Sequence, residues 1–349
     1  MASTGLRRTL SGNGNQNTAT FSVWVKRTST ANDARIYTSW YDGNNQGWIT
    51  FTNNTVGFFI YQSSSYSVQV RTNRVFRDTN AWYHVLFAID TTQSTAADRV
   101  KIYINGVQET SMAQTDYPNQ NQSLPFGLAS YNQRIGERDG DDYFEGIMSH
   151  FNFVDGAALT PSSFGETDST TGEWTIKASP SVTYGSNGFF ILKDSGSVTD
   201  QSGNSNNWTV NSGTLSNTED CPDNNFATLN VLVRSSGGAF SQGCNTFTDT
   251  SGSYQSAFSS IGMFNGQGKY YAEFKVVSGT SLLFGIADKK LAGVIDRIED
   301  GETRYLGEYA NSYGYQRNGN FYYNGSSTGT GYDSFTTNDI IGVAVDMEN

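Results

Sequence analysis

The chain has 349 residues and a formal net charge of −11, with 33 acidic side chains against 22 basic ones. Binding to a nucleic-acid backbone draws on clustered Lys and Arg, so this balance argues against DNA or RNA as a partner. The 37 glycines and 14% aromatic content, without long segments of helical period, are typical of a turn-rich all-β protein. A length prior of roughly 150 residues per domain predicts two domains.

The first part of the chain is a series of strand patterns. Residues 20–27 alternate along the chain, as a strand with one buried face does. Residues 82–90 are largely apolar on both faces, which is typical of a central strand in a sandwich. Residues 100–104 alternate again and stop at Asn105-Gly106, a dipeptide that favours a two-residue type I′ hairpin turn. Further strands are predicted at 47–52, 56–62, 66–72 and 143–156.

These patterns divide the chain into three parts. We expect a β-sandwich over residues 1–165. Residues 166–233 are polar with isolated aromatic side chains, which predicts a connector wrapped over neighbouring surfaces, or a few short strands, without a large core of its own. Alternation returns within 234–349, where Asn318-Gly319 marks a second hairpin. The chain stops directly after an apolar strand, so we expect the second sandwich to be incomplete at its C-terminal end.

The order of these pieces resembles known families. The segments "TFSVWVKR", "WYHVLFAIDTT", "DRVKIYINGVQ" and "YFEGIMSHFNFVDGAALTPSSFGE" together resemble a laminin-G or concanavalin A-like jelly roll, in the form found in virion proteins of tailed bacteriophages. The segments "GKYYAEFKV", "LLFGIAD" and "DIIGVAVDMEN" resemble the first part of a SPRY domain, itself a concanavalin-like sandwich. The resemblance implies an all-β chain of two jelly-roll β-sandwiches joined by an irregular linker.

The same resemblance implies a function. It suggests a non-enzymatic virion protein, a tail or head fibre or related appendage, whose lectin-like loops bind a host-surface glycan. It also implies other virion proteins as partners and a homotrimer, in a protein made in the host cytoplasm. The sequence shows neither the apolar core of a signal peptide nor a membrane span, so we expect no export signal and no membrane insertion. A purely structural virion module is the second interpretation, and a glycan depolymerase the third.

The most ligand-like stretch is "SWYDGNNQGW", residues 39–48. Sugar sites combine aromatic faces with a few placed polar groups that meet hydroxyls. The alternative, which the composition favours, is that the two tryptophans close the end of the sandwich and the Asn residues form turns. The glycan candidates are Trp40, Tyr41, Asp42, Asn44, Asn45 and Trp48.

Carboxylates are spaced two apart in "GERDGDDYFEG" at Glu137, Asp139 and Asp141. Concanavalin-like glycosidases place alternate carboxylates along one strand, about 5 Å apart. Asp-Gly-Asp-Asp is turn chemistry, however, so we favour a solvated acidic turn over a metal-binding loop or a catalytic pair. Because laminin-G-like domains often bind Ca²⁺ through rim aspartates, Asp139, Asp141 and Asp142 are the calcium candidates. Residues 200–206 also resemble a calcium loop, but an Asx-turn network is favoured there.

Other reactive side chains are few. His84 and His150 each lie in a predicted strand, so we expect packed rather than catalytic histidines. Cys221 and Cys244 are too few for a disulfide framework, and two reduced thiols are favoured over a bridge. Alternating tyrosines are common on exposed sheet faces, but those near the second hairpin are candidates for an interaction surface. They are Tyr309, Tyr313, Tyr315 and Tyr322.

Overall fold

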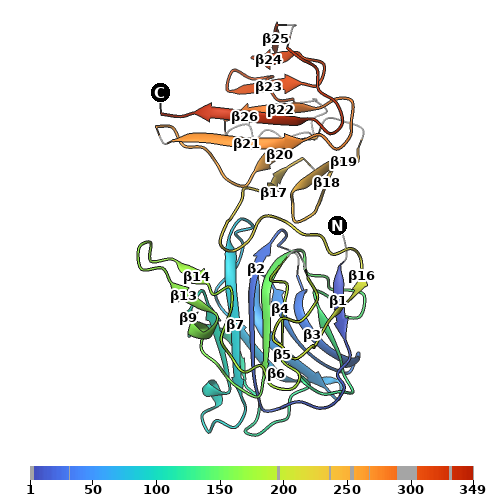
Figure 1. The fold of residues 1–349 in the computed structure, drawn as a ribbon, viewed down its shortest axis with the longest axis vertical. Helices are drawn as coiled ribbons and strands as arrows, with labels where there is room; N and C mark the ends of the chain where they lie inside the picture. The colour runs from blue at the N-terminus through green and yellow to red at the C-terminus, as the bar shows by residue number, and fades with distance from the viewer. Residues whose placement is uncertain are drawn as a thin grey trace. The chain divides into compact units, whose positions relative to one another are not determined.

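The computed structural model describes residues 4–30, 32–194, 197–235, 237–251, 255–266, 268–288, 305–329 and 332–348. Its regular elements in those ranges are β-strands and two short 3₁₀ turns, Ala96–Asp98 and Pro161–Ser163, which confirms the all-β class (Figure 1). The chain forms two compact units, residues 1–226 and 227–349. Among the described residues there is no helix with the length and apolar character of a membrane span.

The first unit is built from two antiparallel sheets, the layers drawn from blue to green in Figure 1. The eight-stranded sheet has the order β10 (Met112–Asp116), β6 (Ser65–Thr72), β5 (Thr55–Gln62), β4 (Asn45–Thr52), β3 (Ala34–Asp42), β11 (Asn132–Ile135), β1 (Gly5–Arg8) and β16 (Thr209–Ser212). The six-stranded sheet has the order β15 (Phe189–Ile191), β12 (Gly146–Asp155), β2 (Thr18–Arg27), β7 (Trp82–Asp90), β8 (Val100–Ile104) and β9 (Val107–Gln108).

Aromatic and branched side chains from both sheets fill the space between them. Phe21 on β2 lies 4.7 Å, ring centre to ring centre, from Tyr37 on β3 and from Phe153 on β12. Successive side chains of a strand point to opposite faces, so burying Ile49 and Phe51 of β4 in this core turns Trp48 and Thr50 outward. Each sheet therefore has an inner face in the core and an outer face that must be covered or left accessible.

Most of the segment predicted as a connector, up to residue 226, belongs to the first unit, and residues 227–233 belong to the second. Strand β15 of this segment pairs with β12, and β16 pairs with β1 at the edge of the eight-stranded sheet. Trp208 lies in the core of the first unit with only 2% of its surface exposed. Asp200 accepts hydrogen bonds from the backbone and hydroxyl groups of Ser202, which is the Asx-type arrangement expected for residues 200–206.

A hairpin of β13 (Gly165–Thr167) and β14 (Trp174–Ile176) covers part of the outer face of the six-stranded sheet. Trp174 Nε1 donates to His84 Nδ1 at 3.0 Å, and the second ring nitrogen of His84 lies 2.8 Å from Ser22 Oγ. Burial lowers the pKa of His84 to about 3 and that of His150, on β12, to about 4. His84 is fully buried, as expected of a packed histidine, whereas His150 is only partly buried.

The hairpin predicted at Asn105-Gly106 is present. Asn105 and Gly106 have φ angles of 48° and 80°, the positive values that a type I′ turn requires, and Ile104 pairs with Val107. A Cβ at Gly106 would lie 2.6 Å from the ring of Trp174. This glycine thus serves both the turn and the hairpin packed on it.

The described residues of the second unit form four small sheets. Strand β17 (Leu229–Arg234) pairs with β20 (Ala257–Ser259), β18 (Gly238–Ser241) with β19 (Thr246–Asp249), and β21 (Lys269–Lys275) with β26 (Ile340–Asp346). The fourth sheet has the order β22 (Leu283–Ala287), β23 (Ser312–Gln316), β24 (Phe321–Tyr323) and β25 (Ser326–Gly329), which confirms the hairpin predicted at Asn318-Gly319. Neither Cys244 in this unit nor Cys221 in the first forms a disulfide bond, as predicted.

Gly106→Ala should destabilise the first unit by about 1–3 kcal/mol, because the added methyl group meets the Trp174 ring and the residue has a positive φ. Gly43→Ala is the matched control, since a Cβ there meets nothing within 4 Å. Urea unfolding of both variants tests this. Equal free energies of unfolding for the two variants would contradict the packing described here.

The free energy of unfolding should fall as the pH drops below 6.5, the ordinary pKa of histidine. The unfolded chain then binds protons that buried His84 takes up only near pH 3 and His150 only near pH 4. Well below pH 6.5 each histidine contributes about 1.4 kcal/mol per pH unit to this loss. Urea unfolding between about pH 7.5 and 4.5 should show a shallower pH gradient for His84→Gln. An unchanged gradient in that variant would rule out His84 as a source.

Candidate functional site

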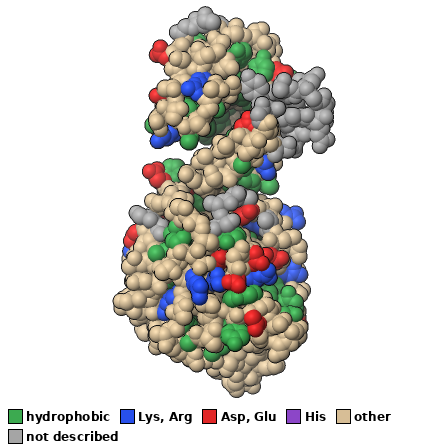
Figure 2. All heavy atoms as spheres, turned by 90° about the vertical axis from the view of Figure 1, so that its right-hand side faces the viewer, with side chains coloured by type: hydrophobic (Ala, Val, Ile, Leu, Met, Phe, Trp, Pro, Cys, Tyr) green, Lys and Arg blue, Asp and Glu red, His purple; other side chains and the backbone are tan. Residues whose placement is uncertain are grey.

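The candidate site is the outer face of the eight-stranded sheet. Figure 2 looks onto the side of the first unit where β1 and β16 lie and shows basic and acidic side chains intermixed in a band, with hydrophobic side chains beside it. We define the outer sheet face by the side chains that alternate away from the core on five neighbouring strands. They are Arg35, Thr38, Trp40, Gln46, Trp48, Phe59, Tyr66 and Arg134.

Strand register brings these side chains together. Thr38 on β3 lies opposite Trp48 on β4 and opposite Arg134 on β11. Trp40 lies opposite Gln46, one row further along the same pair of strands. Polar and aromatic groups therefore alternate across the face.

An aromatic cluster forms one half of the face. The rings of Trp48 and Phe59 stack with centres 5.6 Å apart, and Tyr66 packs edge-on at 6.0 Å from Trp48. The Arg35 guanidinium lies 4.4 Å from the centre of the Trp48 ring, within the range of a cation–π contact. Trp48 is only 6% exposed, whereas Tyr66 is 53% exposed. Tyr66 is thus the accessible ring of the cluster, and Trp48 supports it from below.

Unpaired polar atoms lie among and beside these aromatic rings. Four buried side-chain atoms there have no hydrogen-bond partner among the described residues: Arg35 Nη1, Thr38 Oγ1, Gln46 Oε1 and Arg134 Nε. Leaving a buried polar group unpaired costs about 1–3 kcal/mol, so most such groups in proteins have a protein or water partner. The set contains two arginine N–H donors, one amide oxygen acceptor and one hydroxyl group that can both donate and accept. Such a set matches the hydrogen-bonding groups of a polyhydroxyl ligand.

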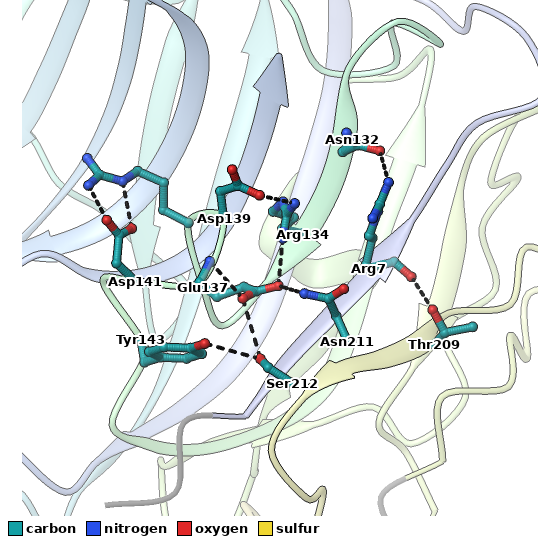
Figure 3. Close-up of polar contacts among 12 residues, drawn as sticks. Arg7, Asn132, Arg134, Glu137, Asp139, Asp141, Tyr143, Thr209, Asn211 and Ser212 are labelled. Atoms are coloured by element: carbon teal, nitrogen blue, oxygen red, sulfur yellow. Dashed lines mark hydrogen bonds and ion pairs between the residues drawn. The ribbon is translucent and has the colours of Figure 1, made fainter. Parts of the chain in front are cut away.

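A buried carboxylate fixes the edge of this face. Figure 3 shows Arg134, Asn211 and Ser212 directed toward Glu137, from β11 and from β16. Arg134 Nη1 donates to Glu137 Oε1 at 2.9 Å, and Asn211 Nδ2 donates to the same oxygen at 2.8 Å. Glu137 is fully buried, and Gly5 gives it room, since a Cβ at that position would lie 2.4 Å from the carboxylate carbon. This network joins β16 to the sheet and holds Arg134 in place.

The three aspartates predicted as calcium candidates are paired with arginines. Asp139 pairs with Arg134, Asp141 with Arg138, and Asp142 with Arg35 at 3.0 Å. The hydrogen bond from Arg138 lowers the pKa of Asp141, whereas burial lowers the pKa of Arg35 despite the nearby Asp142 carboxylate. Among the described residues, no group of three or more His, Cys, Asp or Glu side chains is arranged to hold a metal ion. The residues form an acidic turn tied down by arginines.

The structure divides the glycan candidates of residues 39–48 between a sheet face and a turn. Trp40 and Trp48 belong to the outer sheet face, on β3 and β4. Asp42 accepts hydrogen bonds from the Asn44 backbone at 2.8 Å and the Asn45 side chain at 3.0 Å. These three residues therefore build a tight hairpin turn. At this end, exposed Tyr41 packs against Tyr131 with ring centres 5.4 Å apart.

The tyrosines predicted as an interaction surface lie on different parts of the second unit. Tyr313 stacks on Tyr323 with ring centres 4.8 Å apart, and Tyr315 packs against Phe335 at 5.4 Å. Tyr322 pairs with Gly314 in the register and so points to the opposite face, where it meets Tyr305. Tyr309 lies in the turn before β23.

Sequence reasoning missed Arg35, Thr38, Gln46 and Arg134. Alternation along the chain places Thr38 with Trp40, and Gln46 with Trp48, so the polar members of the two strands carried a usable signal. The pairing of β11 with β3, which brings in Arg134, joins segments far apart in the sequence. Local patterns do not reveal such a pairing.

Comparison with family models places both parts of the chain. Residues 6–163 match the model of the concanavalin A-like lectin/glucanases superfamily, Laminin_G_3, and residues 269–349 match the SPRY domain model. The chain thus combines a concanavalin A-like domain with a SPRY domain. The first match spans most strands of the first unit and includes Arg35, Trp48 and Arg134. No curated protein sequence matches the chain.

Several solved structures are similar to part of the chain. Domain 4 of AbnA, an extracellular arabinanase from Geobacillus stearothermophilus in complex with arabinotriose, has 24% identity and a TM-score of 0.33, covering 42% of this chain and 65% of that one. A pentraxin from Limulus polyphemus has 17% identity and a TM-score of 0.34, covering 46% and 72%. A sialidase CBM40 from Ruminococcus gnavus bound to α2,3 sialyllactose has 14% identity and a TM-score of 0.30, covering 42% and 83%. The chain thus spans less than two thirds of the arabinanase domain structure.

Glu137→Ala should lower the free energy of unfolding by about 3 kcal/mol, because it leaves the buried Arg134 guanidinium without its main partner. Asp141→Ala is the matched control: this carboxylate also pairs with an arginine but is 55% exposed, so its loss should cost less than about 1 kcal/mol. Urea unfolding measures both. A smaller effect for Glu137→Ala than for the control would show that the network does not stabilise the edge.

Proposed function

We propose that the first unit binds a glycan on the outer sheet face. The observation that carries this proposal is the cluster of four unpartnered, buried polar atoms beside an aromatic cluster on one face. A bound sugar would supply hydroxyl groups to these donors and acceptors, which would otherwise depend on water. The concanavalin A-like family match supports the proposal, since lectins occur in this superfamily.

The geometry suggests how a sugar would be oriented. Arg35 Nη1 and Arg134 Nε present donors, Gln46 Oε1 presents an acceptor, and Thr38 Oγ1 presents both. The half-exposed ring of Tyr66 offers an apolar surface to the C–H side of a pyranose. Strand pairing and the Glu137 network hold the polar atoms before a ligand arrives, which reduces the entropy lost on binding.

We further propose that the site binds without cleaving. Glycoside hydrolysis needs one carboxyl group kept protonated as an acid and a second one free as a base or nucleophile. The carboxylates beside the outer sheet face are instead engaged by arginines, as in the Glu137–Arg134 and Asp142–Arg35 pairs. Such pairing occupies carboxylate oxygen atoms that would otherwise be available to act on a sugar.

The biological setting that fits this activity is a phage virion. The resemblance of the sequence segments to tailed-phage proteins supports a tail or head fibre, assembled as a trimer with other virion proteins, that attaches to a host-surface glycan. The second unit exposes large apolar side chains, including Phe264, Tyr271 and Ile340, which favours a protein-binding role for it within the virion. We thus propose for the second unit the role of a structural virion module, which was the second interpretation of the sequence.

Thr38→Val and Tyr66→Ala should each weaken glycan binding by about tenfold or more, because a lost hydrogen bond or stacking surface costs about 1.4 kcal/mol or more. Thr115→Val is the matched control, since Thr115 lies in the same sheet, opposite Val70 rather than on the outer sheet face. Binding of the full chain to a glycan array is measured first, with and without EDTA, and then titrated for the best ligand. Loss of binding in EDTA would indicate that glycan binding requires a calcium ion.

Failure of the folded chain to bind any glycan on the array or on bacterial cells would overturn the adhesin proposal. Binding that survives both substitutions would move the site elsewhere on the molecule.

A further inference from the structure

Lys26 is a buried cation with an unusual set of neighbours. It lies near the C-terminal end of β2, and alternation with core residue Val25 directs its side chain to the outer face of the six-stranded sheet. Its side chain is 0% exposed. Nζ lies 2.6 Å from Asp220 Oδ2 and 2.8 Å from Asn225 Oδ1, and it also donates to the backbone oxygen of Phe226 at 3.1 Å. An amine, a carboxyl group and a primary amide therefore meet at one point.

The surroundings of this point are aromatic and orient both partners of the lysine. Trp82 lies directly opposite Lys26 on β7, and its Nε1 donates to Asp220 Oδ1 at 2.8 Å. The Asp220 side chain is 1% exposed. Asn225 Nδ2 donates to the backbone oxygen of Asn80 at 3.1 Å, which turns the amide oxygen, and with it Cγ, toward Lys26. Asn225 itself lies at the surface, so a small leaving group has a way out.

We propose that Lys26 and Asn225 become joined by an isopeptide bond, with Asp220 relaying the proton. Burial disfavours charge, so transfer of a proton from Nζ to Asp220 yields a neutral amine next to a neutral acid. The Nζ lone pair attacks Cγ of Asn225, and a new C–N bond forms. Asp220 then passes its proton to Nδ2 and takes up the second proton from Nζ, the Cγ–Nδ2 bond breaks, and ammonia leaves. The proton left on Asp220 departs with the ammonia as ammonium, which restores the carboxylate. One amine and one primary amide become one secondary amide and ammonia, with no oxidant or cofactor.

Asn225 is the electrophile in this set because the Asp220 carboxylate is resonance-stabilised and already hydrogen-bonded at both oxygens, by Lys26 and by Trp82. The bond would connect an inner strand of the six-stranded sheet to a residue two positions before the second unit begins at Ala227. A pulling force applied through the second unit would then pass into β2 by a covalent path, and residues 27–224 would not have to bear it.

The test is the mass of the folded full-length chain. The bond lowers the intact mass by about 17 Da, one ammonia, and protease digestion should release a branched peptide that contains both Lys26 and Asn225. Lys26→Arg and Asn225→Ala should each abolish the branched peptide and restore the full mass expected from their sequences. Asp220→Asn, which keeps the shape but not the proton acceptor, should do the same.

Lys101→Arg is the matched control, because Lys101 forms a partly exposed ion pair with Asp98 and should not affect the mass loss. If Asp220→Asn does not fold, the peptide map of the unmodified chain still decides the question. Separate Lys26 and Asn225 peptides from folded protein after prolonged incubation would overturn the proposal and leave an ion pair. The outcome is independent of glycan binding, since no residue of the outer sheet face takes part.

Discussion

The period of two in a β-strand is the constraint on which the first unit depends. Because neighbouring side chains point to opposite faces, filling the core between two sheets creates an outer face on each of them. The chain treats the two outer faces differently. On the six-stranded sheet the residues after 164 cover the outer face, with Trp174 on His84 and Asp220 on Lys26. On the eight-stranded sheet, aromatic rings and arginines form a surface with unsatisfied polar atoms.

Both outer faces contain buried polar groups. On the six-stranded sheet Trp24 Nε1 has no partner among the described residues, but the groups around Lys26 and His84 are matched. Lys26 has a full set of acceptors, and the His84 ring has a partner at each nitrogen. Burial that is fully matched in this way fixes one arrangement of the covering segment. On the outer sheet face, by contrast, Thr38 Oγ1 has no described partner although its residue is fully buried. Matched polar groups suit a face that is permanently covered by a segment of the same chain. Unmatched polar groups suit a face that binds a ligand.

The sequence was most informative where structure is decided locally. The hairpin at Asn105-Gly106 was predictable because its positive φ angles suit those residues, and the all-β class followed from alternation. Strand β3 was missed because its apolar and polar residues do not alternate cleanly: a register shift lies between Arg35 and Tyr37. For the same reason local patterns do not separate the turn of the 39–48 stretch from the two paired strands to which most of it belongs.

The segment 166–226 was hardest to predict because few apolar residues interrupt its polar sequence. Trp208 enters the core of the first unit as a single side chain from a polar stretch, and its ring meets that of Phe189 edge to face at 4.9 Å. No periodic pattern accompanies a single anchoring side chain, so composition alone indicates a solvated connector. The candidate site had the same difficulty, since Arg134 reaches Thr38 through pairing of distant strands.

The pairing of β1 with β16 affects how the chain folds while it is being synthesised. Leu6 is among the first described residues of the chain, yet it lies opposite Val210, more than half of the chain later. While the intervening residues are being synthesised, one hydrogen-bonding edge of β1 stays open to other chains. Closing so long a loop is slow compared with forming the β8–β9 hairpin. Strand β16 therefore covers the edge of β1 only late in synthesis. Until it does, nascent chains can associate through this exposed strand edge.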